Sequence, residues 1–392
     1  MPKPVIVAGA RTPIGKLLGA LAPLSAPQLA GAAIAAALDR AGITGEQVDA
    51  VIIGNVIQAG VGPNPARLGA VAGGIPMRVP AITVNKLCLS GLAAIAQAAA
   101  QVTAGYNEIV VAGGTESMTN APHLLPGSRQ GIKYGSAPIA DALDHDGLVC
   151  GLDGVSMGAS TERDQAGLGI SRAEQDEFAA QSHAKAATAV KDGRLAEEIT
   201  PVTVATRGGS VTVADDEGVR PGTTAAQLAA LRPAFAENGN ITAGSASQLS
   251  DGACSLVVMS AERAADLGLP WIAEIGAYGT VAGPDTSLLF QPANAIRDAL
   301  RRDGTTRLGD LDLIEINEAF AAITLASVRD LGVPADRVNV NGGAIALGHP
   351  VGMSGARLAL TLALELGRRG GGTGAAALCG GGGQGDALIL RV

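Results

Sequence analysis

Two stretches of the chain decide the fold, because they repeat each other. ALDRAGITGEQVDAVIIGN occupies residues 37–55, and ALRRDGTTRLGDLDLIEINE occupies residues 299–318. Val48 in the first stretch aligns with Leu311 in the second, an offset of 263 residues (311 − 48). Each stretch is typical of a helix followed by a buried strand.

The repeat continues further along both copies. SGLAAIAQAAA from Ser90 aligns with SGARLALTLAL from Ser354, an offset of 264 residues (354 − 90). EIVVAGG at 108–114 then corresponds to AAALCGGGG at 375–383. A nearly constant offset across helices and strands predicts a duplicated α/β unit.

The segment between the copies, residues 120–248, has a different character. It includes a polar helix whose Ser171 and Glu174 form an S-x-x-E capping box. We interpret this segment as a loop domain that is inserted over the core and shapes a substrate site. The remaining chain then divides into two core halves, residues 1–119 with 249–269 and residues 270–392.

Composition limits the classes of function. The chain has 392 residues, enough for two or three domains, with 47% hydrophobic and only 16% charged residues. A net charge of −8 and an aromatic content of 2% argue against a nucleic-acid partner. No apolar run of 18 residues is present, so we expect no membrane association.

The four cysteines, at positions 88, 150, 254 and 379, are too far apart in the sequence for a CxxC zinc or redox pair. The N-terminal stretch lacks the basic and apolar regions of a secretory signal. We therefore expect a cytoplasmic protein with reduced cysteines and no metal site.

Cys88 is the first candidate for chemistry. It lies in VNKLCLSG (84–91), where a β-prone segment meets a long alanine-rich helix. Unpaired N–H groups and the helix dipole at such a terminus favour a thiolate, which makes Cys88 a candidate nucleophile. The alternative interpretation is a small buried hydrophobic residue.

The second copy supplies two partners. His349 stands in a glycine-rich turn that is the counterpart of the Cys88 turn, so the two can face each other across a pseudo-twofold axis. Cys379 ends a strand and four glycines follow. GxGxxG at 380–385 is followed by the strand-like DALILRV and not by a helix, so we reject a dinucleotide site and predict a loop suited to an oxyanion hole.

These residues stand among longer motifs that carry a family resemblance. The motifs are VIVAGARTPIGK (5–16), AGGTESMTNAPH (112–123), RPAF (232–235) and ITAGSASQLSDGA (241–253). The sequence resembles the thiolase family and, within it, acetyl-CoA C-acetyltransferases (acetoacetyl-CoA thiolases). The resemblance implies two α/β halves that form a five-layered α-β-α-β-α core.

The resemblance also implies a reversible Claisen condensation of two acetyl-CoA molecules through an acetyl-cysteine intermediate. Cys88 is the implied nucleophile, His349 its base and Cys379 the second acid and base. Asn317, in the NEAF motif, is implied to hold a water, and the N–H groups of Cys88 and Gly381 to form an oxyanion hole.

Coenzyme A and acetyl-CoA are implied as substrates, with acetoacetyl-CoA as product and no permanently bound cofactor. The implied contacts to coenzyme A are Leu148, Met157, Arg220, Phe235, Ala243, Ser247, Ala319 and Phe320. Taken singly, the apolar members of this set are equally typical of core packing. The family also implies a homodimer, or a homotetramer assembled through a loop in the 120–145 region.

Three departures from the family pattern bear on acyl chain length. They are Leu89 after the nucleophile, Ser156 in place of a histidine, and the loop at 281–294. A degradative 3-ketoacyl-CoA thiolase of broader chain length therefore stays open as an alternative. A ketoacyl synthase fits less well because it needs two histidines, and a non-catalytic acyl-CoA-binding relative would be expected to lack Cys88, His349 or Cys379.

Overall fold

The structure is a computed structural model that describes residues 2–392. Its core is one ten-stranded mixed sheet in the order β12-β13-β14-β11-β1-β10-β5-β3-β4, with β2 beside β10. The first half contributes β1 (Pro4–Arg11), β2 (Gly15–Lys16), β3 (Ala50–Gly54), β4 (Ala81–Val84), β5 (Ile109–Ser117) and β10 (Ser250–Ser260). The second half contributes β11 (Ala273–Ala282), β12 (Leu313–Ile316), β13 (Thr373–Gly380) and β14 (Gln384–Arg391).

The two halves have the same topology, as the internal repeat predicts. β3 is parallel to β4 and β5, and antiparallel pairs continue through β10 to β1. Likewise β12 is parallel to β13, antiparallel pairs continue through β14 to β11, and Val338 forms an isolated parallel bridge to β12 in place of β4. The halves join where β1 and β11 pair antiparallel, with Val5 opposite Glu274.

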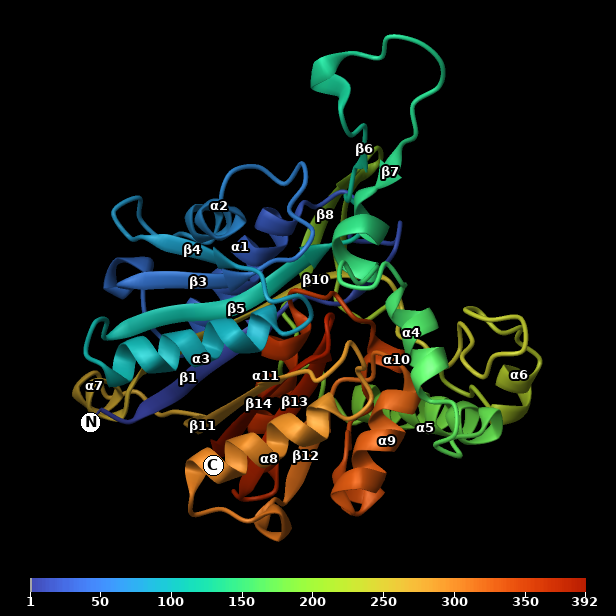
Figure 1. The fold of residues 1–392 in the computed structure, drawn as a ribbon. Helices are drawn as coiled ribbons and strands as arrows, with labels where there is room; N and C mark the ends of the chain where they lie inside the picture. Colours follow the sequence, from blue (N-terminus) through green and yellow to red (C-terminus); the bar gives the residue numbers. More distant parts are fainter. Residues whose placement is uncertain (1) are drawn as a thin grey trace.

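Helices complete five layers. α3 and α11 contact strands of both halves and lie between them, α1 and α2 cover the outer face of the first half, and α8 covers that of the second (Figure 1). The predicted five-layered α/β fold is confirmed. The core helices are α1 (Ala26–Ala41), α2 (Pro65–Ala72), α3 (Ser90–Thr103), α7 (Ala261–Asp266), α8 (Gln291–Asp303), α9 (Ala321–Leu331), α10 (Ala344–Leu347) and α11 (Ser354–Arg368), with short helical turns η1 (Gly45–Gln47), η4 (Leu308–Asp310) and η5 (Ala335–Arg337).

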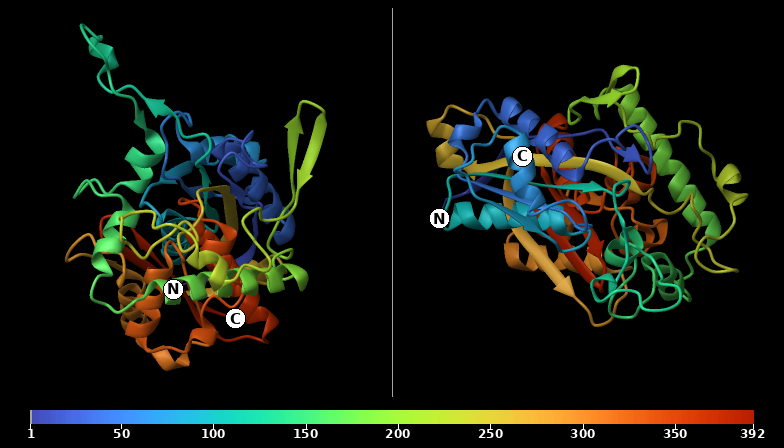
Figure 2. Two further views of the ribbon diagram at one scale, coloured as in Figure 1. Left: turned by 90° about the vertical axis from the view of Figure 1, so that its right-hand side faces the viewer. Right: turned by 90° about the horizontal axis from the view of Figure 1, so that it is seen from above.

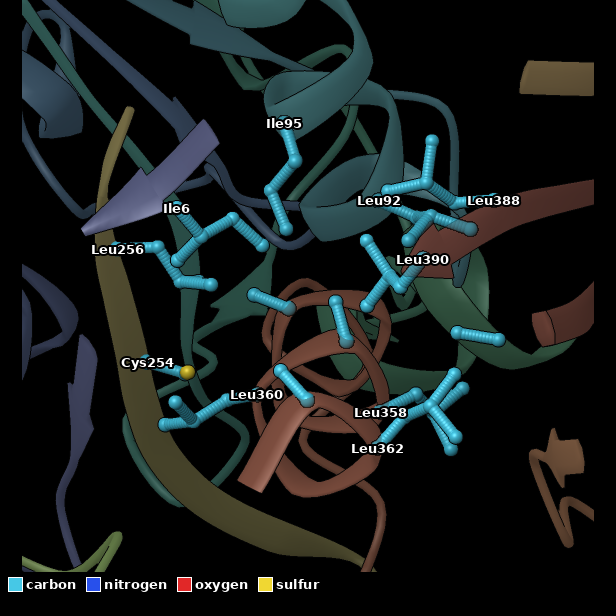
Figure 3. Close-up of a cluster of buried hydrophobic side chains, with 14 of the residues drawn as sticks. Ile6, Leu92, Ile95, Cys254, Leu256, Leu358, Leu360, Leu362, Leu388 and Leu390 are labelled. Atoms are coloured by element: carbon cyan, nitrogen blue, oxygen red, sulfur yellow. The ribbon is translucent and has the colours of Figure 1, made fainter. Parts of the chain in front are cut away.

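The central layer buries one continuous apolar cluster. Figure 3 shows Leu256 of β10 and Leu390 of β14 in the same cluster as Leu360 of α11. Side chains from both halves of the sheet and from both central helices are thus removed from water together, which holds the two halves as one body.

Glycines let the two central helices approach closely at their N-termini. A Cβ atom on Gly91 would lie 2.9 Å from the backbone nitrogen of Ala356, and one on Gly355 would lie 2.5 Å from that of Leu92. Only glycine permits such backbone contact. The turns that precede α3 and α11 are therefore brought together.

The segment at 120–248 packs beside the core. The Ser171–Glu174 capping box is confirmed: Ser171 N–H donates to Glu174 Oε2 at 2.9 Å, and Glu174 N–H donates to Ser171 Oγ at 3.2 Å. The segment contains β6 (His123–Leu124), η2 (Ser128–Gln130), β7 (Ala140–Asp141), η3 (Asp144–Leu148), α4 (Met157–Asp164), α5 (Arg172–Lys191), β8 (Val202–Thr206), β9 (Gly209–Val213) and α6 (Ala225–Ala229). Its treatment as a separate domain stays a prediction.

Two parts of this segment stand away from the body. The chain between β6 and β7 extends outward as a long loop (Figure 1), and the β8–β9 hairpin projects from another side (Figure 2). Within residues 2–392, no helix combines the length and apolar character needed to cross a membrane.

Candidate active site

The turn that carries Cys88 joins the edge strand β4 to α3. Lys86 N–H donates to Ser90 Oγ at 2.8 Å, and the Ser90 hydroxyl donates to the Leu87 carbonyl at 2.6 Å. Leu87 itself has φ 53°, in the left-handed region that bulky residues rarely occupy. The turn thus presents Cys88 directly before the first turn of α3, as the sequence predicts.

Burial opposes the thiolate that the helix terminus favours at Cys88. Burial raises the pKa of the Cys88 thiol to about 11, although hydrogen bonds from the N–H groups of Cys88 and Gly381 lower it. Desolvation disfavours the charged form more strongly than these dipoles favour it. Cys88 is therefore a neutral thiol at neutral pH.

His349 lies in the turn before α11. Its Nδ1 lies 2.5 Å from Ser354 Oγ, and the Ser354 hydroxyl donates to the Pro350 carbonyl at 2.9 Å. Because that hydroxyl proton is already committed, Nδ1 carries the hydrogen and donates it. Nε2 is then the basic nitrogen, and it accepts from Asn317 Nδ2 at 3.3 Å.

Two effects keep the His349 imidazole neutral. Burial, with a smaller contribution from the Arg357 cation, lowers the pKa of His349 to about 3.

Asn317, directly after β12, contacts the His349 ring at Nε2 and helps to orient it. Its Oδ1 is buried and has no hydrogen-bond partner among residues 2–392.

Cys379 is the last residue but one of β13, and a tight glycine turn leads from there into β14. As predicted, a strand and not a helix follows these glycines. Burial raises the pKa of Cys379 above its ordinary value, and the neighbouring Cys88 adds to this. Cβ atoms on Gly380 and Gly381 would lie 2.6 Å from Leu89 Cγ and 2.3 Å from Met157 Cε, so the loop runs close against these side chains.

A cavity of about 190 Å³ unites these groups. Its wall is mostly apolar and includes a ring pair, Phe235 and Phe320, at an edge-to-face centroid distance of 5.7 Å. The predicted site residues that line it are Cys88, Leu148, Met157, Phe235, Ser247, Ala319, Phe320, His349, Cys379 and Gly381. Cys88 and His349 thus meet at one cavity, as the facing turns predict.

Three predicted residues do not line the cavity. Asn317 lies behind His349 and reaches the site through the imidazole. Arg220 and Ala243 are exposed, and the Arg220 N–H donates to His183 Nδ1 at 3.2 Å. The roles assigned to all the predicted residues stay predictions.

The structure also places the residues that depart from the family pattern. Ser156 and Leu288 line the cavity, so the loop at 281–294 contributes to its wall. The Ser156 hydroxyl accepts from Ala159 N–H at 3.3 Å and caps α4. Leu89 is fully buried and does not line the cavity itself, but it packs against Gly380, which does.

Sequence reasoning missed two buried residues next to the site. Ser354 fixes the His349 tautomer, and the alignment of Ser354 with Ser90 at two helix starts is the signal that could have found it. Glu116 accepts from Asn55 Nδ2 at 2.8 Å and from Gly352 N–H at 3.0 Å. Burial raises the pKa of Glu116 to about 7.

No group of three or more His, Cys, Asp or Glu side chains in the described part of the chain is arranged to bind a metal ion.

Comparison with known proteins identifies the family. The model of the thiolase N-terminal domain matches residues 4–262, and that of the thiolase C-terminal domain matches residues 269–392. A "Probable acetyl-CoA acetyltransferase" of Mycolicibacterium smegmatis is 57% identical over 99% of this chain and 100% of its own length. An "Acetyl-CoA acetyltransferase" of Pseudomonas aeruginosa is 48% identical over 98% of each chain.

A solved structure leads to the same family as the family models and the relatives. The crystal structure of the Bacillus anthracis acetyl-CoA acetyltransferase is 40% identical and superposes with a TM-score of 0.97, covering 100% of this chain and 99% of the other. Since both family models match in order across nearly the whole sequence, the chain belongs to the thiolase family.

Proposed function

We propose that the chain is an acyltransferase that catalyses the reversible condensation of two acetyl-CoA molecules to acetoacetyl-CoA and coenzyme A. The observation that carries this proposal is the convergence of Cys88, His349, Cys379 and the Gly381 N–H group on one apolar cavity. The names of the bacterial relatives support the same activity.

In the first step, His349 Nε2 takes the proton of Cys88 while the sulfur attacks the thioester carbonyl of acetyl-CoA. Because Cys88 has a raised pKa and His349 a lowered one, the proton moves as the sulfur attacks and not before. The carbonyl oxygen accepts from the N–H groups of Cys88 and Gly381. The bond to coenzyme A breaks, and Cys379 donates its proton to the departing thiolate.

In the second step, the Cys379 thiolate removes a proton from the methyl group of a second acetyl-CoA. The enolate oxygen is stabilised by the His349 imidazolium and by a water bound to Asn317, whose buried Oδ1 is available as an acceptor. The enolate carbon attacks the acetyl carbon on Cys88, the bond to sulfur breaks, and His349 returns its proton to Cys88.

We assign coenzyme A to the cavity mouth as a substrate, with no permanently bound cofactor. Phe235, Phe320 and Met157 offer the apolar surface that a pantetheine arm needs, and exposed Arg220 offers a cation for the nucleotide phosphates. Reduced cysteines are required by this chemistry, which favours the cytoplasm, and all four cysteines are free.

A degradative 3-ketoacyl-CoA thiolase of broader chain length remains the second candidate. Leu288 and Ser156 support its consideration, because both line the cavity at departures from the family pattern, where a changed wall changes the acyl chain that fits. A relative from Staphylococcus epidermidis, 44% identical, carries the wider name "Probable acetyl-CoA acyltransferase".

One experiment separates these functions. Thiolysis by coenzyme A is measured on 3-ketoacyl-CoA substrates of increasing length, starting with acetoacetyl-CoA, with Cys88→Ala as control. Activity confined to acetoacetyl-CoA supports the proposed function, and equal activity on longer chains supports the second candidate. Unchanged thiolysis by Cys88→Ala would contradict the nucleophile, and inactivity on all substrates would leave a non-catalytic acyl-CoA-binding protein.

We further propose a homodimer or homotetramer. The loop between β6 and β7 exposes Ile132, Tyr134 and Ile139, which an assembled neighbour would cover. Sedimentation equilibrium of the wild-type chain checks this proposal, and a stable monomer would contradict it.

A further inference from the structure

Lys86 lies two residues before Cys88, and its side chain crosses from the first half of the molecule to the second. Its ammonium donates to Asp386 Oδ1 at 2.7 Å, to Thr280 Oγ1 at 2.8 Å and to Tyr278 OH at 3.2 Å. An ammonium has three donors, so these three acceptors satisfy it completely. An ion pair therefore ties the nucleophile turn to β11 and β14.

Asp386 connects this ion pair to the strands that carry Cys379. It is fully buried, and Tyr278 OH donates to its second carboxylate oxygen. On the β13–β14 ladder Asp386 pairs with Leu378, directly beside the pair that Cys379 forms with Gly385. The Lys86–Asp386 ion pair thus links the turn before Cys88 to the β13–β14 ladder beside Cys379, although the two cysteines belong to different halves.

The turn needs an anchor because its backbone is strained. Leu87, between Lys86 and Cys88, has φ 53°, and such a conformation persists only where the surroundings enforce it. Lys86 is held at its backbone as well as at its side chain: its N–H donates to Ser90 Oγ, and its carbonyl accepts from Leu89 N–H at 3.2 Å.

We propose that Lys86 is a positioning residue for the nucleophile. By binding Asp386, Thr280 and Tyr278, it holds Cys88 at the distance from Gly381 and Cys379 that acyl transfer requires. Lys86 exchanges no proton in the reaction, and its effect reaches the substrate through Cys88 alone. The kinetic part of this proposal rests on the proposed thiolase activity.

The test compares Lys86→Met, Lys86→Arg and the wild-type chain. We expect Lys86→Met to lower kcat for acetoacetyl-CoA thiolysis by roughly ten- to a hundredfold with a nearly unchanged KM, because a small misplacement of a reacting group carries such a cost. Alkylation of Cys88 by iodoacetamide, followed by mass spectrometry at fixed pH, should slow because the sulfur leaves the Gly381 N–H group. Lys86→Arg keeps the ion pair and should recover part of both rates.

Arg78→Met is the matched control, since it breaks an ion pair with Glu46 in which both side chains are more than half exposed. It should leave kcat and Cys88 alkylation unchanged. A folded Lys86→Met variant with wild-type kcat and wild-type alkylation would overturn the proposal, even if its melting temperature were lower.

Two milder variants decide the question if Lys86→Met does not fold. Thr280→Val and Tyr278→Phe each remove one acceptor and keep the ion pair, so each should produce a smaller loss of Cys88 alkylation, and wild-type rates in both would overturn the proposal. If the wild-type chain shows no thiolysis, the proposed function fails, whereas the alkylation rates still decide the role of Lys86.

Discussion

His349 and Ser354 form the hydrogen bond that decides which nitrogen of the imidazole can act as a base. The Nδ1 to Oγ distance is 2.5 Å, and the serine hydroxyl in turn donates to Pro350. This arrangement leaves Nε2 without a hydrogen, on the side of Asn317. The chemistry proposed for Cys88 thus depends on a serine at the first position of α11.

Ser354→Ala should lower kcat for thiolysis by roughly ten- to a hundredfold, less than complete loss of a general base. Without the hydroxyl, the Nδ1 tautomer loses its acceptor and the ring is free to rotate. Steady-state kinetics with acetoacetyl-CoA measure the effect, with His349→Ala as the reference for complete loss. A wild-type kcat in Ser354→Ala would show that the tautomer is held by other contacts.

Alkylation of Cys88 should report its raised pKa directly. With a pKa of about 11, the thiolate fraction and hence the rate rise about tenfold for each pH unit between 7 and 10. Mass spectrometry after timed iodoacetamide treatment measures the rate at Cys88, and Cys88→Ser gives the background. A rate that reaches its plateau below pH 8 would contradict the neutral resting thiol.

Gly380→Ala should displace the loop that carries Cys379, because its Cβ atom would lie 2.6 Å from Leu89 Cγ. Leu89 is fully buried and cannot move aside. We expect kcat to fall roughly a hundredfold, and the double variant Leu89→Ala with Gly380→Ala to recover part of the loss. Equal kinetics for Gly380→Ala and wild type would show that the loop tolerates the contact.

His183 should make the fold less stable in acid. Burial, with the nearby Arg220 cation, lowers the pKa of His183 to about 4, whereas the unfolded chain has the ordinary value near 6.5. Between these values the unfolded state binds a proton that the folded state does not, so stability falls as the pH drops. His183 alone contributes about 2 kcal/mol to the loss of stability between pH 7 and pH 5.

His183→Gln is the matched variant, because its amide oxygen can still accept from Arg220 N–H. Urea unfolding at pH 7 and pH 5 measures the free energy of unfolding of both proteins. The variant should lose about 2 kcal/mol less than the wild type over this interval. The same loss in both would mean that His183 is not the group that titrates.

The repeat also explains why equivalent positions carry different chemistry. Ile53 and Ile316 are equivalent in the repeat, and Ile53 pairs with Gly113 of β5 as Ile316 pairs with Ala377 of β13. Two residues further along β5 and β13 stand Thr115 and Cys379, so a threonine hydroxyl and the thiol occupy equivalent places. The Thr115 hydroxyl donates to the Ala26 carbonyl at 2.7 Å within the first half, whereas Cys379 lines the cavity together with Cys88.

The motifs predicted the family, the five layers and the residues that meet at the cavity. They did not predict the neutral Cys88 thiol, since a helix terminus favours a thiolate in water and only the burial of this one reverses the balance. Nor did they predict Glu116, because a glutamate in a strand gives no sign that it lies buried beneath the opposite turn.

The sequence by itself determined the duplicated architecture and the turns that hold Cys88, His349 and Cys379, because local hydrophobic periodicity and glycine placement specify strands, helices and turns. Tertiary structure decided how those turns act on each other. The Lys86–Asp386 ion pair joins residues 300 positions apart, and the protonation of Cys88 and His349 depends on burial. Such long-range contacts and desolvation exist only after the two halves have packed together.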